Sequence, residues 1–321
     1  MKPFLIGDVH LGRKFRNKDI PLDKRGVREQ ILRLRFQQYV DLAIKSVKSG
    51  KYDTVVQMGD LFDSPTVPYE DLLFAYEQLS KFSKNRVECI IIAGNHDLPK
   101  DKSRVSALSM LQRMFANDQY ITFVMNEVYV RLPFSKFDPT EHVFIPYNHE
   151  CDSRKMLEKY KSTPDYDSYI YGHFDEPFPA NWQSDFAHVY TGHIHKPREE
   201  GNVTVVGSIL PLTFAEDVHN SFMRTVTLDE YEADLKAGLS DYRCYRIKLR
   251  EGEELPEEKH CLQMSVYNEN TDGDSAENLE VEFEAFDIEK LLHEALDETG
   301  LFDEVYNLYV EYKMTEAGEN V

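Results

Sequence analysis

The sequence has 321 residues, of which 41% are hydrophobic and 29% are charged, and its formal net charge is −20. This composition is typical of a soluble globular protein and argues against a disordered chain or a collagen-like repeat. No stretch approaches the ~20 apolar residues of a transmembrane helix, and the N-terminal apolar run is too short for a secretory signal. Because the four cysteines are scattered and form no CxxC pair, we expect a cytoplasmic protein with reduced thiols and no membrane association.

The negative charge is concentrated near the C-terminus. Residues 1–250 hold 34 basic and 35 acidic side chains, whereas residues 251–321 hold 3 basic and 22 acidic ones. Residues 1–50 hold 12 basic and 5 acidic side chains. An acidic chain can therefore still offer a local cationic surface to phosphates, with Arg13, Lys14 and Arg16 as candidate substrate contacts. A solvated basic loop and helix face without any partner fits the same charge pattern equally well.

The first 115 residues alternate between short apolar runs and amphipathic stretches. The runs predict buried strands at 4–6, 54–58 and 87–93, and the periodic stretches predict helices at 28–47, 72–82 and 105–115. Apolar strands that alternate with amphipathic helices indicate a parallel sheet with both faces covered. Each predicted strand ends in a polar motif, and ligands of open α/β sheets bind at the carboxyl ends of strands.

Beyond residue 120 the pattern changes to closely spaced strands. Apolar runs predict strands at 128–132, 142–147, 168–171, 187–190, 203–206, 223–228 and 243–249. One helix, at 153–161, is predicted among them. We therefore expect a second, mixed sheet that packs against the first. Polar motifs at 171–173 and 191–195 again follow two of its strands.

The composition changes again at residue 251. The polar run at 268–278 predicts an exposed loop, followed by a strand at 279–283, a helix at 288–298 and a strand at 305–312. The sequence thus predicts two domains. Residues 1–258 form an α/β domain, a two-sheet sandwich flanked by helices, and residues 259–321 form a small acidic α+β domain.

Polar side chains gather at five of the predicted strand ends. They are Asp8 with His10, Asp60, Asn95 with His96, His173, and His193 with His195. Each motif alone is common at a turn, but five such endings in one chain are hard to explain as coincidence. Imidazole and carboxylate together suit Mn, Fe or Zn better than Mg or Ca alone. Two such ions about 3.5–4 Å apart clamp a phosphate and generate a hydroxide nucleophile, so the pattern predicts phosphate-ester hydrolysis.

These motifs resemble those of the calcineurin-like metallophosphoesterases. DVH at 8–10, GDLFD at 59–63, GNHD at 94–97, GH at 172–173 and GHIH at 192–195 follow the order of that family. The resemblance implies two Mn²⁺ ions, with Mg²⁺, Fe or Zn as alternatives. The first would be held by Asp8, His10, Asp60 and His195, and the second by Asp60, Asn95, His173 and His193. His96 would act near the scissile phosphate as proton donor or transition-state stabiliser, with Asp97 orienting its ring.

A further segment narrows the resemblance. GSILPLTF at 207–214, with Glu216 after it, is similar to a signature of the SbcD-type DNA repair nucleases of bacteria and phages, as are DVHLG and GDLFD. The protein Ser/Thr phosphatases carry DRG where this chain has GDLFDSP. The resemblance implies a Mn-dependent 3′–5′ exonuclease on duplex DNA and endonuclease on single strands, in double-strand-break processing, recombination or replication. It also implies a homodimer bound to an SbcC-like SMC-type ATPase, with residues 259–321 as a capping domain.

Two departures and two alternatives accompany this hypothesis. Members of the SbcD-type family usually continue into a helical segment that binds the ATPase, whereas this chain ends about nine residues after its last predicted strand. In addition, position 63 is Asp where some members have an active-site His. A phosphodiesterase or phosphatase for small nucleotides, or a catalytically weak interaction subunit, would share the same motifs. Residues 28–48 and 69–84 are candidate dimer faces, although their apolar residues also suit a buried core.

Overall fold

The computed structural model describes residues 1–15, 20, 24–131, 140–150, 152–164 and 166–267. The first part of the chain forms a parallel sheet in the order β1-β2-β3-β4. Its strands are β1 (Pro3–Ile6), β2 (Thr54–Gln57), β3 (Cys89–Ile92) and β4 (Ile121–Val124), and the helices between them are α1 (Val27–Lys48), α2 (Tyr69–Asn85) and α3 (Ala107–Met114). The predicted alternation of strands and helices is confirmed. β4 was not predicted, because its run of four residues at the sheet edge is only partly buried.

A second, mixed sheet has the order β5-β6-β7-β8-β10-β9. Its strands are β5 (Tyr129–Arg131), β6 (Thr140–Ile145), β7 (Asp167–His173), β8 (His188–Gly192), β9 (Arg198–Glu200) and β10 (Val203–Val205). The four inner strands are parallel, and β5 and β9 pair antiparallel at the edges. The predicted mixed sheet is therefore confirmed. The predicted helix at 153–161 is a 3₁₀ helix, η2 (Ser153–Tyr160), and a short helix α4 (Trp182–Asp185) was missed.

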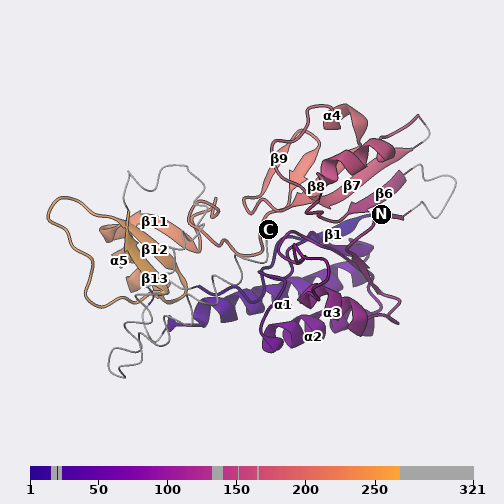
Figure 1. Cartoon of the computed structure of the whole chain (residues 1–321). Coiled ribbons are helices and arrows are strands. Elements are labelled where there is room, and N and C mark those ends of the chain that lie inside the picture. Colours follow the sequence, from indigo (N-terminus) through magenta and orange to yellow (C-terminus); the bar gives the residue numbers. More distant parts are fainter. Residues whose placement is uncertain (16–19, 21–23, 132–139, 151, 165, 268–321) are drawn as a thin grey trace, which may run out of the picture. The chain divides into compact units, whose positions relative to one another are not determined.

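Side-chain alternation along the strands explains how the layers stack. Val55 and Ile91 pack in one apolar cluster with residues of α1, α2 and α3. Their neighbours Val56 and Ile90 pack in another cluster with Phe144 of the second sheet. Because successive residues of a strand point to opposite faces, the first sheet lies between the three helices and the second sheet (Figure 1). Residues of η2 and α4 cover the outer face of the second sheet, so the predicted sandwich flanked by helices is confirmed.

Residues 223–266 form a third sheet rather than part of the second one. Its parallel strands are β11 (Met223–Thr227), β12 (Cys244–Lys248) and β13 (Gln263–Val266), and α5 (Leu228–Lys236) and the 3₁₀ helix η3 (Ser240–Tyr242) lie between them. The strands predicted at 223–228 and 243–249 exist, but their assignment to the second sheet was wrong. Helix α5 was also missed. Its start carries a capping box between Thr227 and Glu230, a signal that the sequence displays.

The predicted domain boundary at 258/259 stays a prediction. β13 lies beyond that position and pairs with β12, and the described residues belong to one compact unit. The strands and helix predicted at 279–312 lie outside the described residues, as does most of the predicted acidic domain at 259–321. Among the residues that the structure describes, no helix combines the length and apolarity needed to span a bilayer.

The apolar layer between the two sheets should dominate the stability of this fold. Phe144 is fully buried there, and Phe144→Ala should lower the free energy of unfolding by about 3–5 kcal/mol, because it removes a buried ring and leaves a cavity. Leu239→Ala is the control: Leu239 is 47% exposed, and its loss should change that free energy by about 0.5 kcal/mol or less. Urea unfolding followed by circular dichroism measures both. Equal losses in the two variants would contradict the assignment of this core.

Candidate metal centre

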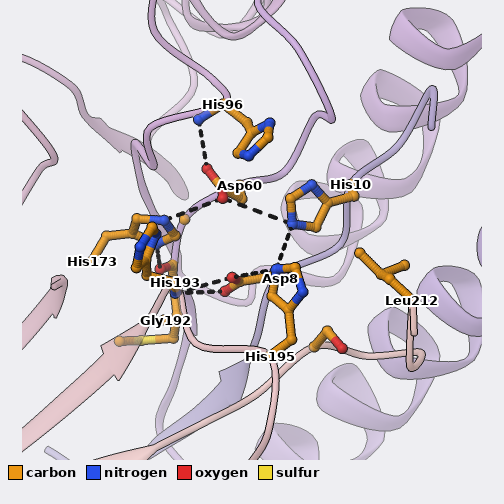
Figure 2. Close-up of polar contacts among 12 residues, drawn as sticks. Asp8, His10, Asp60, His96, His173, Gly192, His193, His195 and Leu212 are labelled. Carbon is orange, nitrogen blue, oxygen red and sulfur yellow. Dashed lines mark hydrogen bonds and ion pairs between the residues drawn. The ribbon is translucent and has the colours of Figure 1, made fainter. Parts of the chain in front are cut away.

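The seven predicted ligands lie at the carboxyl ends of strands in the two facing sheets. Asp8 and His10 follow β1, Asp60 follows β2, Asn95 follows β3, His173 ends β7, and His193 and His195 follow β8. Figure 2 shows side chains from both sheets turned toward one another around Asp8 and Asp60. The tertiary structure therefore brings together residues that are up to 187 positions apart in the sequence.

One group of atoms that could bind a metal ion, called donors here, surrounds His10. Asp8, His10 and His195 each offer a ligand atom within 4.8 Å of the others. The Nε2 atoms of His10 and His195 are 3.0 Å apart, and His195 Nε2 is 3.6 Å from Asp8 Oδ2. Asp60 Oδ2 lies 3.8 Å from His10 Nε2. The four residues expected to hold the first metal thus direct donors to one place.

A second group lies on the other side of Asp60. Asp60, His173 and His193 each offer a ligand atom within 4.8 Å of the others. His173 Nε2 lies 3.2 Å from Asp60 Oδ2 and 2.9 Å from Asn95 Oδ1, and His193 Nδ1 lies 3.0 Å from Asn95 Oδ1. The Asp60 carboxylate therefore faces both groups, as a bridging ligand does. Imidazole, carboxylate and amide donors in this arrangement fit a pair of transition-metal ions.

The backbone at these strand ends is shaped to direct the ligands. His10 (φ 55°), Asp60 (φ 51°) and His193 (φ 75°) all adopt the left-handed conformation, which costs a non-glycine residue about 1–3 kcal/mol. Gly94 passes so close to Asp60 that a Cβ atom at this position would overlap its carboxylate. Such strain clusters at functional sites because the surrounding structure holds it in place. The strained backbone conformations lower the local stability, but they direct the ligand side chains toward one another.

Each imidazole also contacts a second partner through its other ring nitrogen. These contacts are His173 Nδ1 to Met58 O at 3.0 Å, His10 Nδ1 to Asp63 Oδ1 at 3.1 Å, His195 Nδ1 to Glu216 Oε1 at 3.2 Å and His193 Nε2 to Asp175 Oδ1 at 2.6 Å. Such partners fix the orientation and tautomer of a ligating ring. Sequence reasoning gave Asp63, Asp175 and Glu216 no role. The signal for Asp63 and Asp175 was an acidic residue in or just after a ligand motif, whereas Glu216 follows the GSILPLTF segment.

His96 lies beside the first group of donors. Its ring centroid is 4.9 Å from that of His10, its Nδ1 is 2.7 Å from the carbonyl oxygen of Asp63, and its backbone N–H donates to Asp60 Oδ1 over 2.9 Å. A ring nitrogen of His96 also lies within 4.8 Å of donor atoms of His10 and Asp60. His96 is therefore placed beside the candidate metal centre.

The expectation that Asp97 contacts and orients the His96 ring is wrong. The buried Asp97 carboxylate instead accepts backbone N–H groups of Leu61 at 3.2 Å, Phe62 at 2.9 Å and Gly94 at 3.0 Å. These acceptor contacts join the loop after β2 to the loop after β3. Asp97 thus holds the backbone that carries Asp60 and His96, and the carbonyl oxygen of Asp63 faces the His96 ring.

Burial and neighbouring charges shift the pKa values of these groups. Burial raises the pKa of Asp8 to about 7. Burial acts to lower the pKa of His173, but the carboxylates of Asp60 and Asp8 outweigh it and raise the pKa to about 10. Burial and the charge of His173 lower the pKa of His193 to about 4. Protons thus supply positive charge to this acidic centre, and divalent cations compete with them for the same atoms.

The predicted substrate-contacting residues are partly engaged within the protein. Arg13 Nη1 lies 3.1 Å from Asp63 Oδ1, Lys14 is exposed, and Arg16 lies outside the described residues. Farther along the basic stretch, Arg28 is buried, with its guanidinium carbon 3.9 Å from the ring centroid of Phe15. Arg33 pairs with Asp71. Only part of this basic stretch therefore remains available to phosphate groups.

The fold and the donor groups together define a class of metal-dependent phosphoesterase. The family model of the calcineurin-like phosphoesterases matches residues 1–197, and the chain belongs to this family. The family uses a pair of divalent metal ions, and the two donor groups are the candidates for holding them.

Several curated relatives are DNA-processing proteins by name. "DNA double-strand break repair protein Mre11" of Methanopyrus kandleri is 27% identical over 233 residues, which cover 66% of this chain and 49% of that protein. The protein of the same name in Methanococcus maripaludis is 27% identical over 218 residues, 61% of this chain and 53% of that protein. "Exonuclease subunit 1" of Enterobacteria phage T4 is 25% identical over 231 residues, 68% of this chain and 62% of that protein. The chain thus spans about half the length of these two Mre11 proteins.

Glu216→Gln should weaken metal binding while the fold is retained. The change removes the charged acceptor 3.2 Å from His195 Nδ1 but keeps a side-chain oxygen for the backbone N–H of Leu212. Loss of such a supporting partner typically lowers metal affinity about 10–100-fold. Calorimetric titration with Mn²⁺ measures the effect, and Glu200→Gln on β9, an exposed carboxylate, is the matched control. An affinity equal to that of the control would contradict the role of Glu216 in holding His195.

The affinity for Mn²⁺ should also rise between about pH 6 and pH 8. The pKa of Asp8 is raised to about 7 and that of His173 to about 10, so both groups hold protons at the lower pH that a cation must displace. Raising the pH removes protons from Asp8 first and lessens this competition. Titrations in two buffers of different ionisation enthalpy count the protons released. An affinity that is constant or falls over this range would contradict the prediction.

Proposed function

We propose that the protein is a metal-dependent DNA nuclease of the SbcD and Mre11 type. The observation that carries this proposal is the pair of donor groups joined by Asp60, with His96 beside them, in a calcineurin-like phosphoesterase fold. The names of the relatives favour DNA as the substrate. Two ions bound there would polarise a phosphodiester and lower the pKa of a bound water.

Each side chain has a specific part in this proposal. Asp8, His10, Asp60 and His195 hold one ion, and Asp60, Asn95, His173 and His193 hold the other. The contact of His96 Nδ1 with the carbonyl oxygen of Asp63 leaves Nε2 for the substrate, where it donates a proton to the leaving oxygen or stabilises the charge that develops. Asp97, Asp63 and Glu216 are positioning residues that act through the groups they hold.

The finer properties of the proposal come from the family resemblance. We propose two Mn²⁺ ions, 3′–5′ exonuclease activity on duplex DNA, endonuclease activity on single strands, and assembly with an SMC-type ATPase. The word "subunit" in the name of the phage T4 relative fits such an assembly. A homodimer is supported by exposed apolar side chains on α1 and α2, since Leu34, Leu42 and Leu73 are each more than half exposed, whereas Leu72 and Leu79 belong to the core.

His96→Ala should separate chemistry from binding. The variant should still bind two Mn²⁺ ions and DNA, but its turnover of labelled DNA should fall about 10²–10⁴-fold, the usual contribution of general acid–base catalysis. Gel assays of cleavage and calorimetric metal titrations measure the two properties, and His219→Ala, an exposed histidine, is the control.

Unchanged turnover in His96→Ala would show that the role assigned to this residue is wrong. A wild-type protein that binds metal and hydrolyses bis(p-nitrophenyl) phosphate, but cleaves no DNA alone or with its ATPase partner, would contradict the nuclease proposal. That result would instead favour a phosphodiesterase for small nucleotides.

A further inference from the structure

A cavity of about 410 Å³ next to the metal centre is lined by basic residues. This basic cavity is defined here by Lys100, Lys102, Arg104, Arg113, Tyr147 and His149. Its lining includes four Lys or Arg residues and no Asp or Glu, although the chain carries a net charge of −20. A concave site of this size is in the range of small-ligand sites, and its charge selects an anion.

Loops from both sheets build the basic cavity. Lys100, Lys102 and Arg104 belong to the loop that follows β3 and the GNHD motif, and Tyr147 and His149 belong to the loop that follows β6. The backbone N–H of Tyr147 donates to the carbonyl oxygen of Ala93 over 2.9 Å, and His149 Nε2 lies 3.0 Å from the carbonyl oxygen of Leu98. The basic cavity therefore lies at the same edge of the sheets as the metal centre.

A row of aromatic rings runs from the metal centre to the basic cavity. A smaller cavity of about 280 Å³ shares Tyr147 and His149 with the basic cavity and is also lined by His173 and Asp175. The ring centroid of Tyr147 is 6.3 Å from that of His173 and 5.1 Å from that of His149. A ligand chain that leaves the metal centre on the His173 side therefore meets aromatic faces first and the cations next.

The cations of the basic cavity are available to a ligand. Within the described part of the chain, Lys100 and Arg113 form no ion pair. Lys102 pairs with exposed Glu150 at 2.6 Å, and Arg104 pairs with exposed Asp101 at 3.6 Å. Exposed pairs of this kind contribute only about 0–1 kcal/mol, so that a phosphate group can replace either carboxylate at little cost.

Two of the three acidic side chains of the smaller cavity have a cationic partner, which limits their repulsion of a phosphate on this path. Asp152 pairs with Arg154 at 2.8 Å, and Asp175 contacts His193 at 2.6 Å. Glu150, the third carboxylate of its lining, is the partner of Lys102.

We propose that the basic cavity binds an unpaired stretch of the DNA strand whose phosphodiester lies at the metal centre. This inference rests on the proposed nuclease function. Phosphates next to the scissile one contact the four cations, and a base stacks on Tyr147 and His149. Cations that follow the backbone, combined with aromatic faces that accept any base, are the features of single-strand binding. A base inside a duplex is already stacked and paired, so it cannot use these rings.

The phosphate contacts are tested with the double variant Lys100→Gln/Arg113→Gln. Its KM for a labelled single-stranded oligonucleotide should rise about tenfold or more, with kcat and the hydrolysis of bis(p-nitrophenyl) phosphate unchanged. The slope of log affinity against log salt should fall by about 1.4, because each phosphate contact on a single strand contributes about 0.7. Lys84→Gln/Arg86→Gln removes the same charge from exposed positions at the C-terminal end of α2, near the opposite edge of the first sheet, and should leave both quantities unchanged.

The stacking contact is tested with Tyr147→Leu. Its affinity for the single strand should fall about tenfold, in line with about 1–3 kcal/mol per stacked base, while the salt slope stays at the wild-type value. Blunt duplex DNA should bind this variant as well as it binds the wild-type protein. Metal content of every variant is measured in parallel and should not change.

Three results would overturn the inference. The first is a salt slope that is the same in Lys100→Gln/Arg113→Gln and in its control. The second is an equal loss of affinity for single-stranded and blunt duplex DNA in Tyr147→Leu. The third is a wild-type protein that binds no single strand. Failure of the proposed function would give a different result. A wild-type protein that binds single strands but hydrolyses only bis(p-nitrophenyl) phosphate would contradict the nuclease proposal, while the assignment of a single strand to the basic cavity would stand.

Discussion

One buried carboxylate, Asp60, is the interaction on which the rest of the site depends. Its side chain faces His10 on one side and His173 on the other, and it accepts the backbone N–H of His96. These three partners come from the loop after β1, the end of β7 and the loop after β3. Asp60 can contact all three only because Val56, Ile90 and Phe144 form an apolar layer that packs the two sheets face to face. Packing of the two sheets therefore also brings the residues of the metal centre together.

A shell of acidic residues and backbone carbonyls keeps the imidazoles in place, and part of it depends on the third sheet. Glu216 holds His195 and accepts the backbone N–H of Leu212. The carbonyl oxygen of Leu212 in turn accepts Arg28 Nη2 at 3.3 Å, and Arg28 Nη1 donates to Gln263 of β13 at 2.8 Å. A continuous set of contacts thus runs from the third sheet to a metal-ligand candidate. This connection gives buried Arg28 a structural role instead of a role at a cationic surface.

The distribution of charge fits a protein that handles a polyanion with only a small part of its surface. Several of the basic residues near the N-terminus that looked free in the sequence are paired or buried, as Arg13, Arg28 and Arg33 illustrate. Lys100 and Arg113 line a cavity without acidic side chains. Phosphate binding needs such a local patch and does not depend on net charge. The acidic tail at 251–321 is therefore compatible with a nucleic-acid substrate.

The sequence alone determined the alternation of the first three strands and three helices and the seven polar residues at strand ends, because apolar periodicity and motif spacing are local properties. It did not reveal Asp63, Asp175 and Glu216 as partners of the histidines, the true contacts of Asp97, or the third sheet with α5. Those depend on which loops meet across the sandwich, and a single sequence does not encode such distances in any local pattern. The same reason explains the basic cavity: its cations lie on α3 and on the loop after β3, its aromatic rings lie on the loop after β6, and these segments become neighbours only when the sheets pack.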